Sequence, residues 1–221
     1  MGDGAGSEIN GHLGTVRGKV FTSIFEENRW INKESVSGYG STLYATTILR
    51  NALPEFLKKY GVVTFLDAPC GDFNWMNHVE MPENVRYLGC DIVGALVETL
   101  KEKFSGPNRS FQVLDIVEGP IPNANMWLCR DAIFHLTLND GLKVLRNAAR
   151  SDIRYFASTT FDFVTFNKDI PTGKFRYINL TRPPYDLPPP IEEIDDFLPP
   201  YVPRQLGIWS AEQLKRRFAA S

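Results

Sequence analysis

Four short apolar segments of the sequence are each followed by an acidic residue, in one case after an intervening arginine. A single acid in such a place is often a helix cap or a solvated turn. Four of them, each after a segment with the composition of a strand, point instead to a common site, because parallel strands place their carboxyl ends at one edge of a sheet. The acids are Asp67, Asp91, Asp115 and, after Arg130, Asp131.

The spacing of these acids matches the parts of a nucleoside. A carboxylate accepts hydrogen bonds from both vicinal hydroxyls of a ribose, and Asp91 follows the first turn by about two dozen residues, where that role is expected. Asp115 could accept a hydrogen bond from the exocyclic amine of an adenine, while the backbone amide of Ile116 donates to the ring. The sequence therefore predicts a nucleoside site.

The turn LDAPCGDFNW, residues 66–75, indicates what the nucleoside carries. A pyrophosphate is bound by a helix start and by backbone amides that several glycines bring close to it. This turn contains one glycine, Gly71, and two carboxylates, Asp67 and Asp72. It would repel a phosphate and favour a ligand with a cationic amino group.

The segments around these acids alternate between two periodicities. Short runs rich in β-branched and aromatic residues predict strands, and apolar residues three and four positions apart predict helices. Strands alternating with helices indicate crossovers, so the predicted fold class is α/β, a doubly wound, Rossmann-like and mostly parallel sheet. The predicted strands are residues 62–66, 85–90, 111–114, 126–129, 155–159 and 206–209, and the helices are 93–104, one that starts after Thr137, and 211–218.

The chain is predicted to form one domain behind a flexible tail, residues 1–18, with order beginning near Val20. Residues 19–60 are predicted to form a helical cap, in which Pro54 opens a second helix. Residues 61–160 are predicted to form the cofactor-binding core. Residues 161–203 contain nine prolines and predict a long loop at the substrate, before a last strand and helix in residues 204–221.

The length, net charge and composition of the chain limit the classes of protein to which it can belong. With 221 residues and a formal net charge of -2, the chain can bury one core and has no long basic run for a nucleic acid. No apolar segment approaches the roughly 20 residues that span a bilayer, and a soluble cytoplasmic protein without a membrane partner is expected. Its cysteines, Cys70, Cys90 and Cys129, lack metal-ligand spacing, so reduced buried thiols and no metal site are predicted.

The first turn resembles the first motif of the class I S-adenosylmethionine-dependent methyltransferases. Where that motif reads D-x-G-x-G-x-G, residues 67–73 read DAPCGDF, so Pro69 and Phe73 replace the outer glycines. The resemblance implies the cofactor S-adenosyl-L-methionine, which has an ammonium, a ribose and an adenine. By this resemblance Asp67, Ala68 and Gly71 line its methionine part, Asp91 holds the ribose, Ile92 packs on the ring, Asp115 and Ile116 hold the adenine, and Asp72 and Arg130 also belong to the cofactor site.

The stretch CRDAIFHL, residues 129–136, is similar to the fourth-strand motif of small-molecule methyltransferases, whose polar residues face the transferring methyl. Methyl transfer to a hydroxyl requires removal of a proton, and His135 suits a base because its pKa lies near neutrality. Asp131 could orient His135 or bind a substrate hydroxyl. The alternative is that His135 is a structural residue.

Outside the core, Trp30 and the SGYGS segment, residues 37–41, are predicted to fold over the cofactor, with Ser41 bonding its carboxylate or simply capping a helix. Trp75 is expected in the core rather than in a ligand wall. Candidate acceptor contacts in the Pro-rich segment are Tyr177, Arg182 and Tyr185.

The stretches ESVSGYGS, NKDIPTGKFRYINL and LGIW are similar to uncharacterised bacterial-type members, which supply no substrate. The predicted function is methylation of a hydroxyl on a small molecule or saccharide, and a homodimer is compatible with it. Three alternatives remain: N-methylation of a small molecule, a non-catalytic S-adenosylmethionine-binding subunit, and a NAD-dependent oxidoreductase. The last would need a glycine-rich turn and a Tyr/Lys pair that the sequence lacks.

Overall fold

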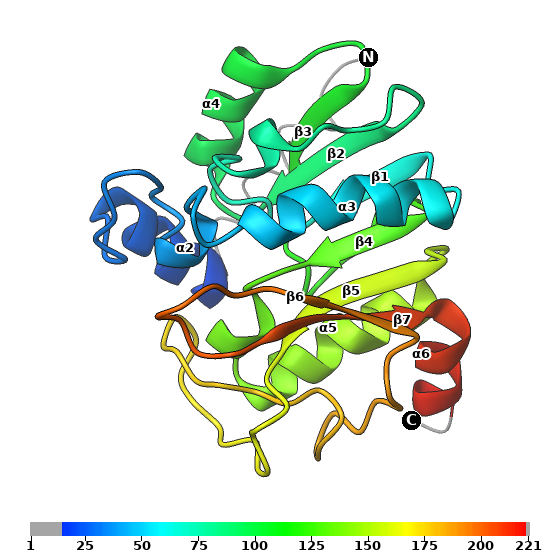
Figure 1. Ribbon diagram of the computed structural model, residues 1–221. Coiled ribbons are helices and arrows are strands. Elements are labelled where there is room, and N and C mark those ends of the chain that lie inside the picture. Colours follow the sequence, from blue (N-terminus) through cyan, green and yellow to red (C-terminus); the bar gives the residue numbers. More distant parts are fainter. Residues whose placement is uncertain (1–14, 220–221) are drawn as a thin grey trace, which may run out of the picture.

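The computed structural model describes residues 15–219, and its centre is a seven-stranded sheet in the order β3-β2-β1-β4-β5-β7-β6 (Figure 1). The pairs among β1 to β5 are parallel, and β7 is antiparallel to both of its neighbours. The strand order reverses between β1 and β4, which is where such sheets bind ligands. The strands are β1 (Thr64–Asp67), β2 (Arg86–Asp91), β3 (Arg109–Val113), β4 (Met126–Cys129), β5 (Tyr155–Thr160), β6 (Glu192–Asp195) and β7 (Gln205–Ser210).

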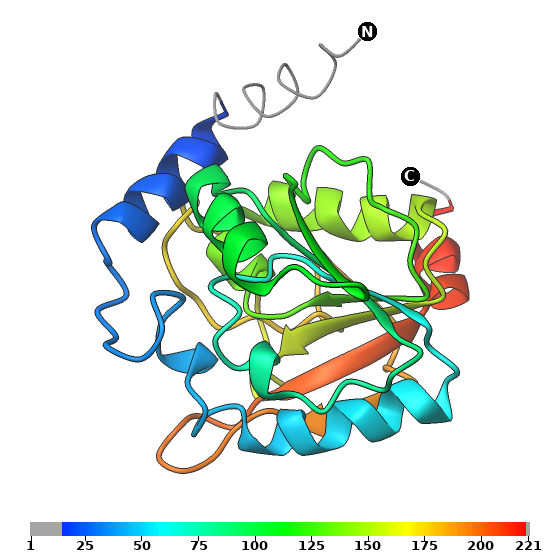
Figure 2. The ribbon, with the colours of Figure 1, turned by 90° about the horizontal axis from the view of Figure 1, so that it is seen from above.

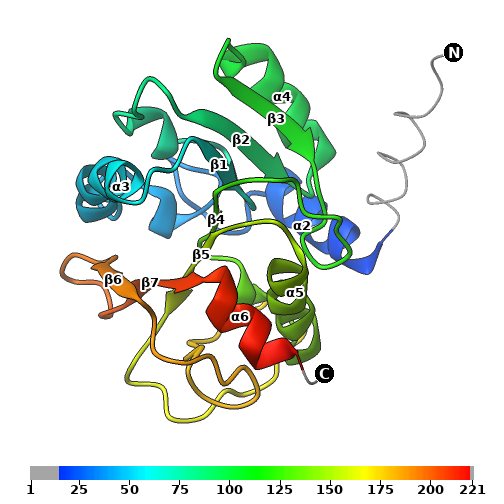
Figure 3. The same ribbon diagram turned by 90° about the vertical axis from the view of Figure 1, so that its right-hand side faces the viewer.

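Helices cover both faces of the sheet, with α3 on one side and α5 and α6 on the other (Figures 2 and 3). Strand β4 shows how one sequence serves both faces: Met126 and Leu128 join the core with α3 and α4, while Trp127 and Cys129 join the core with α5 and α6. A central parallel strand is therefore apolar throughout. The helices are α3 (Thr47–Lys59), α4 (Gly94–Phe104), α5 (Leu138–Arg150) and α6 (Ala211–Phe218).

The predicted strands and helices of the core form, with ends that differ by at most two residues, and β4 and α6 have the predicted bounds. Thr137 caps α5, accepting a hydrogen bond from the amide of Asp140. Strand β6 lies where only loop was predicted. It is an edge strand paired with β7 alone, and an edge strand can expose charges such as those of its sequence EEID.

The helix break predicted at Pro54 is wrong. A single helix, α3, runs through Pro54, which is itself buried. A proline inside a helix costs about 3 kcal/mol, but fully burying an apolar side chain stabilises by about 1.5–3 kcal/mol. Several such side chains on α3 are buried on one face and outweigh that cost; they are Leu49, Leu53, Phe56 and Leu57.

The predicted tail and the start of order need correction as far as the structure reaches. Residues 1–14 of that tail lie outside the described residues, but residues 16–18 begin helix α2 (Val16–Glu26), so order starts before Val20. Thr15 caps this helix by accepting a hydrogen bond from the amide of Gly18. Phe21 and Ile24 of α2 face the rest of the protein. The glycine-rich composition before α2 therefore led to a predicted tail whose end, at residue 18, lies too far along the chain.

The Pro-rich segment, residues 161–203, is irregular apart from β6, as predicted, but it belongs to the core. Ile178, Leu180 and Tyr185 are fully buried. Irregular backbone can be buried only if its polar groups find partners, and here the side-chain amides of Asn167 and Asn179 donate to backbone carbonyls of the same segment. The segment is thus fixed in place. None of the helices formed by the described residues is long and apolar enough to cross a membrane.

Candidate functional site

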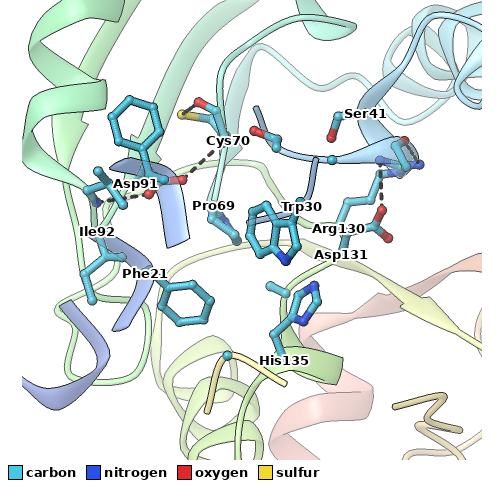
Figure 4. Close-up of a pocket in the computed structure, with 18 of the residues that line it drawn as sticks. Phe21, Trp30, Ser41, Pro69, Cys70, Asp91, Ile92, Arg130, Asp131 and His135 are labelled. Carbon is cyan, nitrogen blue, oxygen red and sulfur yellow. Dashed lines mark hydrogen bonds and ion pairs between the residues drawn. The ribbon is translucent and has the colours of Figure 1, made fainter. Parts of the chain in front are cut away.

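A cavity of about 550 Å³ opens at the carboxyl ends of β1, β2 and β4 (Figure 4). This volume is in the range of small-molecule sites. Its walls also include α2, the 3₁₀ turn η1 (Tyr39–Ser41), residues 173–175 and Arg204. The predicted site residues that line it are Trp30, Ser41, Asp67, Gly71, Asp91, Ile92, Asp115, Ile116, Arg130, Asp131 and His135.

Two of the predicted cofactor residues, Ala68 and Asp72, are not among the residues that line the cavity. Ala68 is fully buried, and its carbonyl accepts a hydrogen bond from Trp127 Nε1 at 2.8 Å. The Asp72 carboxylate accepts one at 2.9 Å from the backbone amide of Val36. The structure therefore gives Asp72 the role of fastening the N-terminal cap to the first turn.

The first turn reaches its shape with one glycine and an anchored aromatic residue. Gly71 has a φ of 56°, and a Cβ there would lie 2.3 Å from Ser37 Oγ. Phe73 also has a positive φ, 61°. That conformation costs about 1–2 kcal/mol, which burial of the phenylalanine ring offsets. The ring packs on three others, those of Tyr87, Phe104 and Phe111.

Asp91 joins the first turn to the start of α4. One carboxylate oxygen accepts a hydrogen bond from the amide of Gly71 at 3.1 Å, and the other accepts one from the amide of Val93 at 3.0 Å. Each carboxylate oxygen can accept two such bonds, so the group keeps capacity toward the cavity that it lines. Burial raises the pKa of Asp91 despite these amides.

Asp67 has a different environment. It is buried, and its carboxylate accepts a hydrogen bond from the Tyr87 hydroxyl at 2.7 Å. Burial raises the pKa of Asp67 to about 7 despite this bond. A cation placed beside Asp67 in the cavity would favour its ionised form.

Asp115 is paired with Arg17 of α2. Nη2 and Nε of Arg17 lie 2.9 and 3.0 Å from Asp115 Oδ2, and the same guanidinium contacts Glu118 and Asp140. Ion pairs across 98 positions therefore close this end of the cavity with α2. The adenine amine predicted to bind Asp115 would compete with Arg17. Apolar side chains around the pair provide a surface for a flat ring, namely those of Phe21, Ile92, Ile116 and Val117.

At the end of β4, Arg130 and Asp131 enter a buried network with two residues from the C-terminal third. Arg130 donates to Asp196 twice, at 2.9 Å each, and to the carbonyl of Gly40 at 2.8 Å. Arg204 donates to Asp131 at 2.9 and 3.1 Å and lies 3.2 Å from Asp196 Oδ2. The Arg130 guanidinium also lies over the ring of Trp75, 5.2 Å from its centroid. Trp75 is thus buried, as expected, and also lines the cavity.

Asp131 is held in an unusual backbone conformation. Its φ is 54°, its amide and carboxylate both bond to Thr159 Oγ1, and Arg204 fixes the carboxylate. Burial by itself would raise the pKa of Asp131, but Arg130 and Arg204 lower it overall. Strained backbone that the surroundings hold in place is common at functional sites.

His135 stands in the short 3₁₀ turn η3 (Ile133–His135) and faces the cavity (Figure 4). Its Nδ1 lies 2.8 Å from the carbonyl oxygen of Lys174, which can only accept, so Nδ1 carries the proton and Nε2 the lone pair. Trp30 stacks on the imidazole with ring centroids 5.3 Å apart. Burial lowers the pKa of His135. Within residues 15–219, Asp131 forms no hydrogen bond with His135, so the orienting group is the Lys174 carbonyl.

The remaining predictions outside the core have mixed outcomes. Ser41 lies in η1 and lines the cavity, so the alternative of a cap on α3 does not hold. Tyr177, Arg182 and Tyr185 are not among the lining residues. The hydroxyl of Tyr185 instead accepts a hydrogen bond from Arg176 at 3.0 Å inside the core.

Sequence reasoning missed several lining residues that come from distant segments. The apolar residues of α2 recur three and four positions apart, a signal of an amphipathic helix that the glycines before it obscured. Nothing in the local pattern marks the others. Among the missed residues are Arg17, Phe21, Phe25, Lys174, Phe175 and Arg204.

Comparison with known proteins gives matches to solved structures only: no family model and no curated protein matches the chain. The methyltransferase domain of bacterial CtHen1-C is similar at 12% identity, with a TM-score of 0.56 over 75% of this chain and 98% of that one. The pyocyanin biosynthetic protein PhzM matches at 14% identity, with a TM-score of 0.55 over 75% of this chain and 55% of that one.

Human N-acetylserotonin methyltransferase, in complex with SAM, matches at 13% identity, with a TM-score of 0.51 over 67% of this chain. The match spans less than half of that enzyme, 44% of its length. Such identities establish the fold alone. Together with the strand order and the cavity at the switch point, they lead to one conclusion: the chain has the Rossmann-like fold of the class I methyltransferases.

Proposed function

We propose that the protein is an S-adenosyl-L-methionine-dependent methyltransferase that acts on a hydroxyl of a small-molecule or saccharide acceptor. The observation that carries the proposal is a single cavity with buried carboxylates at one end and, at the other, a histidine with its lone pair on Nε2. The first end suits a cationic nucleoside, and the second suits removal of a proton.

The residues at the β1 to β3 ends fit the cofactor by their donor and acceptor chemistry. Asp91 would accept hydrogen bonds from the ribose hydroxyls, and Asp67 would pair with the ammonium. Ser41 would bind the amino-acid carboxylate, because its hydroxyl has no hydrogen-bond partner within the part of the chain that the structure describes. Ile92 and Val117 would hold the adenine between apolar surfaces.

The chain's own contribution to the reaction is alignment and proton removal. When bound, the cofactor supplies a methyl group on a positively charged sulfur, which keeps the electron pair of the broken bond and leaves as a neutral thioether. His135 Nε2 accepts the proton of the acceptor hydroxyl as its oxygen bonds the methyl carbon. The Lys174 carbonyl and the Trp30 ring fix the imidazole for this role.

Asp131 acts on His135 through its charge. Arg130, Arg204 and Thr159 hold its carboxylate, so the group is ionised and immobile. Its negative charge favours the protonated imidazole that forms during transfer, because opposite charges nearby raise the pKa of a histidine.

The proposal is tested by titration calorimetry with S-adenosylhomocysteine and with NAD. We expect S-adenosylhomocysteine to bind and NAD to show no binding. The variant Asp91→Asn should weaken S-adenosylhomocysteine binding roughly 10- to 100-fold, since a hydrogen bond to a charged group contributes about 1.5–3 kcal/mol. Asp152→Asn, an exposed site outside the cavity, is the matched control and should bind like the native protein. Binding of NAD in place of S-adenosylhomocysteine would contradict the proposal.

A further inference from the structure

The His135 end of the cavity is lined by aromatic rings in contact with one another. Phe134 meets the imidazole edge-on with centroids 4.6 Å apart, and Phe175 contacts Phe134 at 5.1 Å. Trp30 stacks on the same imidazole, with ring centroids 5.3 Å apart. All of these rings line the cavity. A molecule bound beside His135 would therefore contact aromatic side chains.

The same ring contacts continue to the surface. Tyr177 contacts Phe175 at 5.0 Å, and Phe163 contacts Tyr177 at 5.4 Å. These three side chains expose 40%, 53% and 52% of their area, respectively, which is unusual for large apolar groups that could have been buried. An exposed apolar surface continuous with a cavity is typical of a ligand entrance.

Phe163, Phe175 and Tyr177 form an aromatic mouth of the cavity, and the charged side chains at the end of β4 are already paired within the protein. Asp131 is bound by Arg204 and Thr159, and Arg130 is bound by Asp196. A saccharide presents several hydroxyls, and each that is buried without a partner costs about 1–3 kcal/mol. The aromatic rings and these paired charges therefore favour an acceptor with a flat apolar body.

The chemistry of the base favours the same kind of acceptor. A phenolic hydroxyl, with a pKa of about 10, is a far stronger acid than an aliphatic hydroxyl, which is about as weak an acid as water. His135 is a neutral imidazole of weak basicity. It can take a proton from a phenol over a much smaller free-energy gap than from a sugar or an alcohol.

We propose that the acceptor is a phenol, a planar aromatic compound whose hydroxyl faces His135 Nε2 while its ring lies among Trp30, Phe134 and Phe175. This inference rests on the proposed methyltransferase function and narrows its acceptor. The phenolic proton passes to Nε2, the phenolic oxygen forms the bond to the methyl carbon, and the sulfur retains the electron pair of the bond that breaks.

Binding of matched probes to the complex with S-adenosylhomocysteine tests the inference. The probes are phenol, 1-naphthol and 2-naphthol, with cyclohexanol and methyl β-D-glucopyranoside for comparison. We expect at least one naphthol to bind at least tenfold more tightly than both comparison compounds. The same naphthol should be methylated in the presence of S-adenosylmethionine, measured as S-adenosylhomocysteine released.

Two variants locate the binding surface. Phe175→Ala should weaken naphthol binding at least fivefold and leave S-adenosylhomocysteine affinity and thermal stability unchanged, because the ring is half exposed. Phe166→Ala removes a more exposed ring, at 76%, that is outside the cavity lining and should change neither affinity. A glucoside or cyclohexanol that binds as tightly as every phenol, or a Phe175→Ala protein that binds naphthol normally, would overturn the phenol inference alone. Failure of S-adenosylhomocysteine itself to bind would instead overturn the proposed function.

Discussion

The two ends of the cavity each contain an aspartate at or just after the end of a strand, and the pKa of that aspartate is shifted in opposite directions. Asp67, the last residue of β1, has one hydrogen-bonding neighbour among the described residues, the Tyr87 hydroxyl, and burial raises its pKa to about 7. At the end of β4, burial would raise the pKa of Asp131 too, but Arg130 and Arg204 lower it. Within residues 15–219 Asp67 has no cationic hydrogen-bond partner, whereas Asp131 is paired with two arginines.

This difference separates an end with free hydrogen-bonding capacity from an end whose charged groups are paired with each other. At the β1 to β3 ends, Asp67 and Asp91 keep capacity for a charged or hydroxylated ligand. At the β4 end the charges neutralise each other and leave His135 among aromatic rings. A cationic cofactor and a largely apolar acceptor would thus meet in one cavity without sharing contacts.

Replacing His135 tests the acceptor end and has the largest expected effect. His135→Ala should lower kcat roughly 100- to 10,000-fold, the contribution of a positioned base, and leave the Kd of S-adenosylhomocysteine within about twofold. His78→Ala removes an exposed histidine outside the cavity and should leave both unchanged. Equal losses in the two variants would show that His135 is structural.

The pH profile of the native protein sharpens the same test. Burial lowers the pKa of His135, and only the neutral imidazole accepts a proton. The value of kcat/KM should therefore rise with pH through an ionisation below 6.5 and then level off. The rise should be absent from the residual activity of His135→Ala.

Breaking the charge network at the end of β4 has the next largest expected effect. Arg130→Met leaves the Asp196 side chain, 0% exposed, without its main partner, and should lower the free energy of unfolding by about 3–5 kcal/mol in chemical denaturation. Lys59→Met removes the exposed pair with Glu192 and should change stability little. Equal small changes in the free energy of unfolding of the two variants would mean that the buried pair of Arg130 with Asp196 does not stabilise the fold.

Titrating the cofactor end has the smallest expected effect. Because the pKa of Asp67 is raised to about 7, its ionised fraction falls below that pH, and S-adenosylhomocysteine should lose up to about tenfold in affinity for each pH unit below 7. 5′-Methylthioadenosine, which lacks the ammonium, should bind with little pH dependence. Asp67→Asn should remove the difference between the two ligands. A difference that persists in this variant would place the ammonium away from Asp67.

The same variant reports on stability with the opposite dependence on pH. A buried carboxyl with a raised pKa stabilises the fold while it is neutral, and this contribution is lost as the pH rises through about 7. Asp67→Asn should therefore melt higher than the native protein at pH 8 by more than it does at pH 5.

Much of the cavity end at β1 to β3 could be predicted from the sequence, because it follows from local periodicity. Runs of alternating or continuous apolar residues predicted every core strand, and the acids Asp67 and Asp91 stand directly at strand ends as expected. Other contacts depend on packing between distant segments. The Arg17 pair with Asp115 joins residues 98 positions apart, and no pattern near either residue indicates it.

The misplaced predictions share that cause. Asp72 was predicted to contact the ligand, yet its carboxylate accepts a hydrogen bond from the backbone amide of Val36, because the cap folds onto the first turn. Tyr185 was a candidate acceptor contact in the Pro-rich segment, but it is buried in the core, because the side-chain amides of Asn167 and Asn179 allow that irregular backbone to be buried. Composition predicted loop correctly and could not indicate that the loop is buried.

The sheet, the acids at its edge and the histidine after β4 could be predicted from the amino-acid sequence, since they follow from side-chain type and spacing along one segment. The partner of each charge depends on how distant segments pack: Tyr87 for Asp67, Arg17 for Asp115, Arg204 for Asp131. The physical reason is that the ionisation of a buried carboxyl depends on burial and on groups within a few ångströms. Those groups lie on segments that can be distant in the sequence.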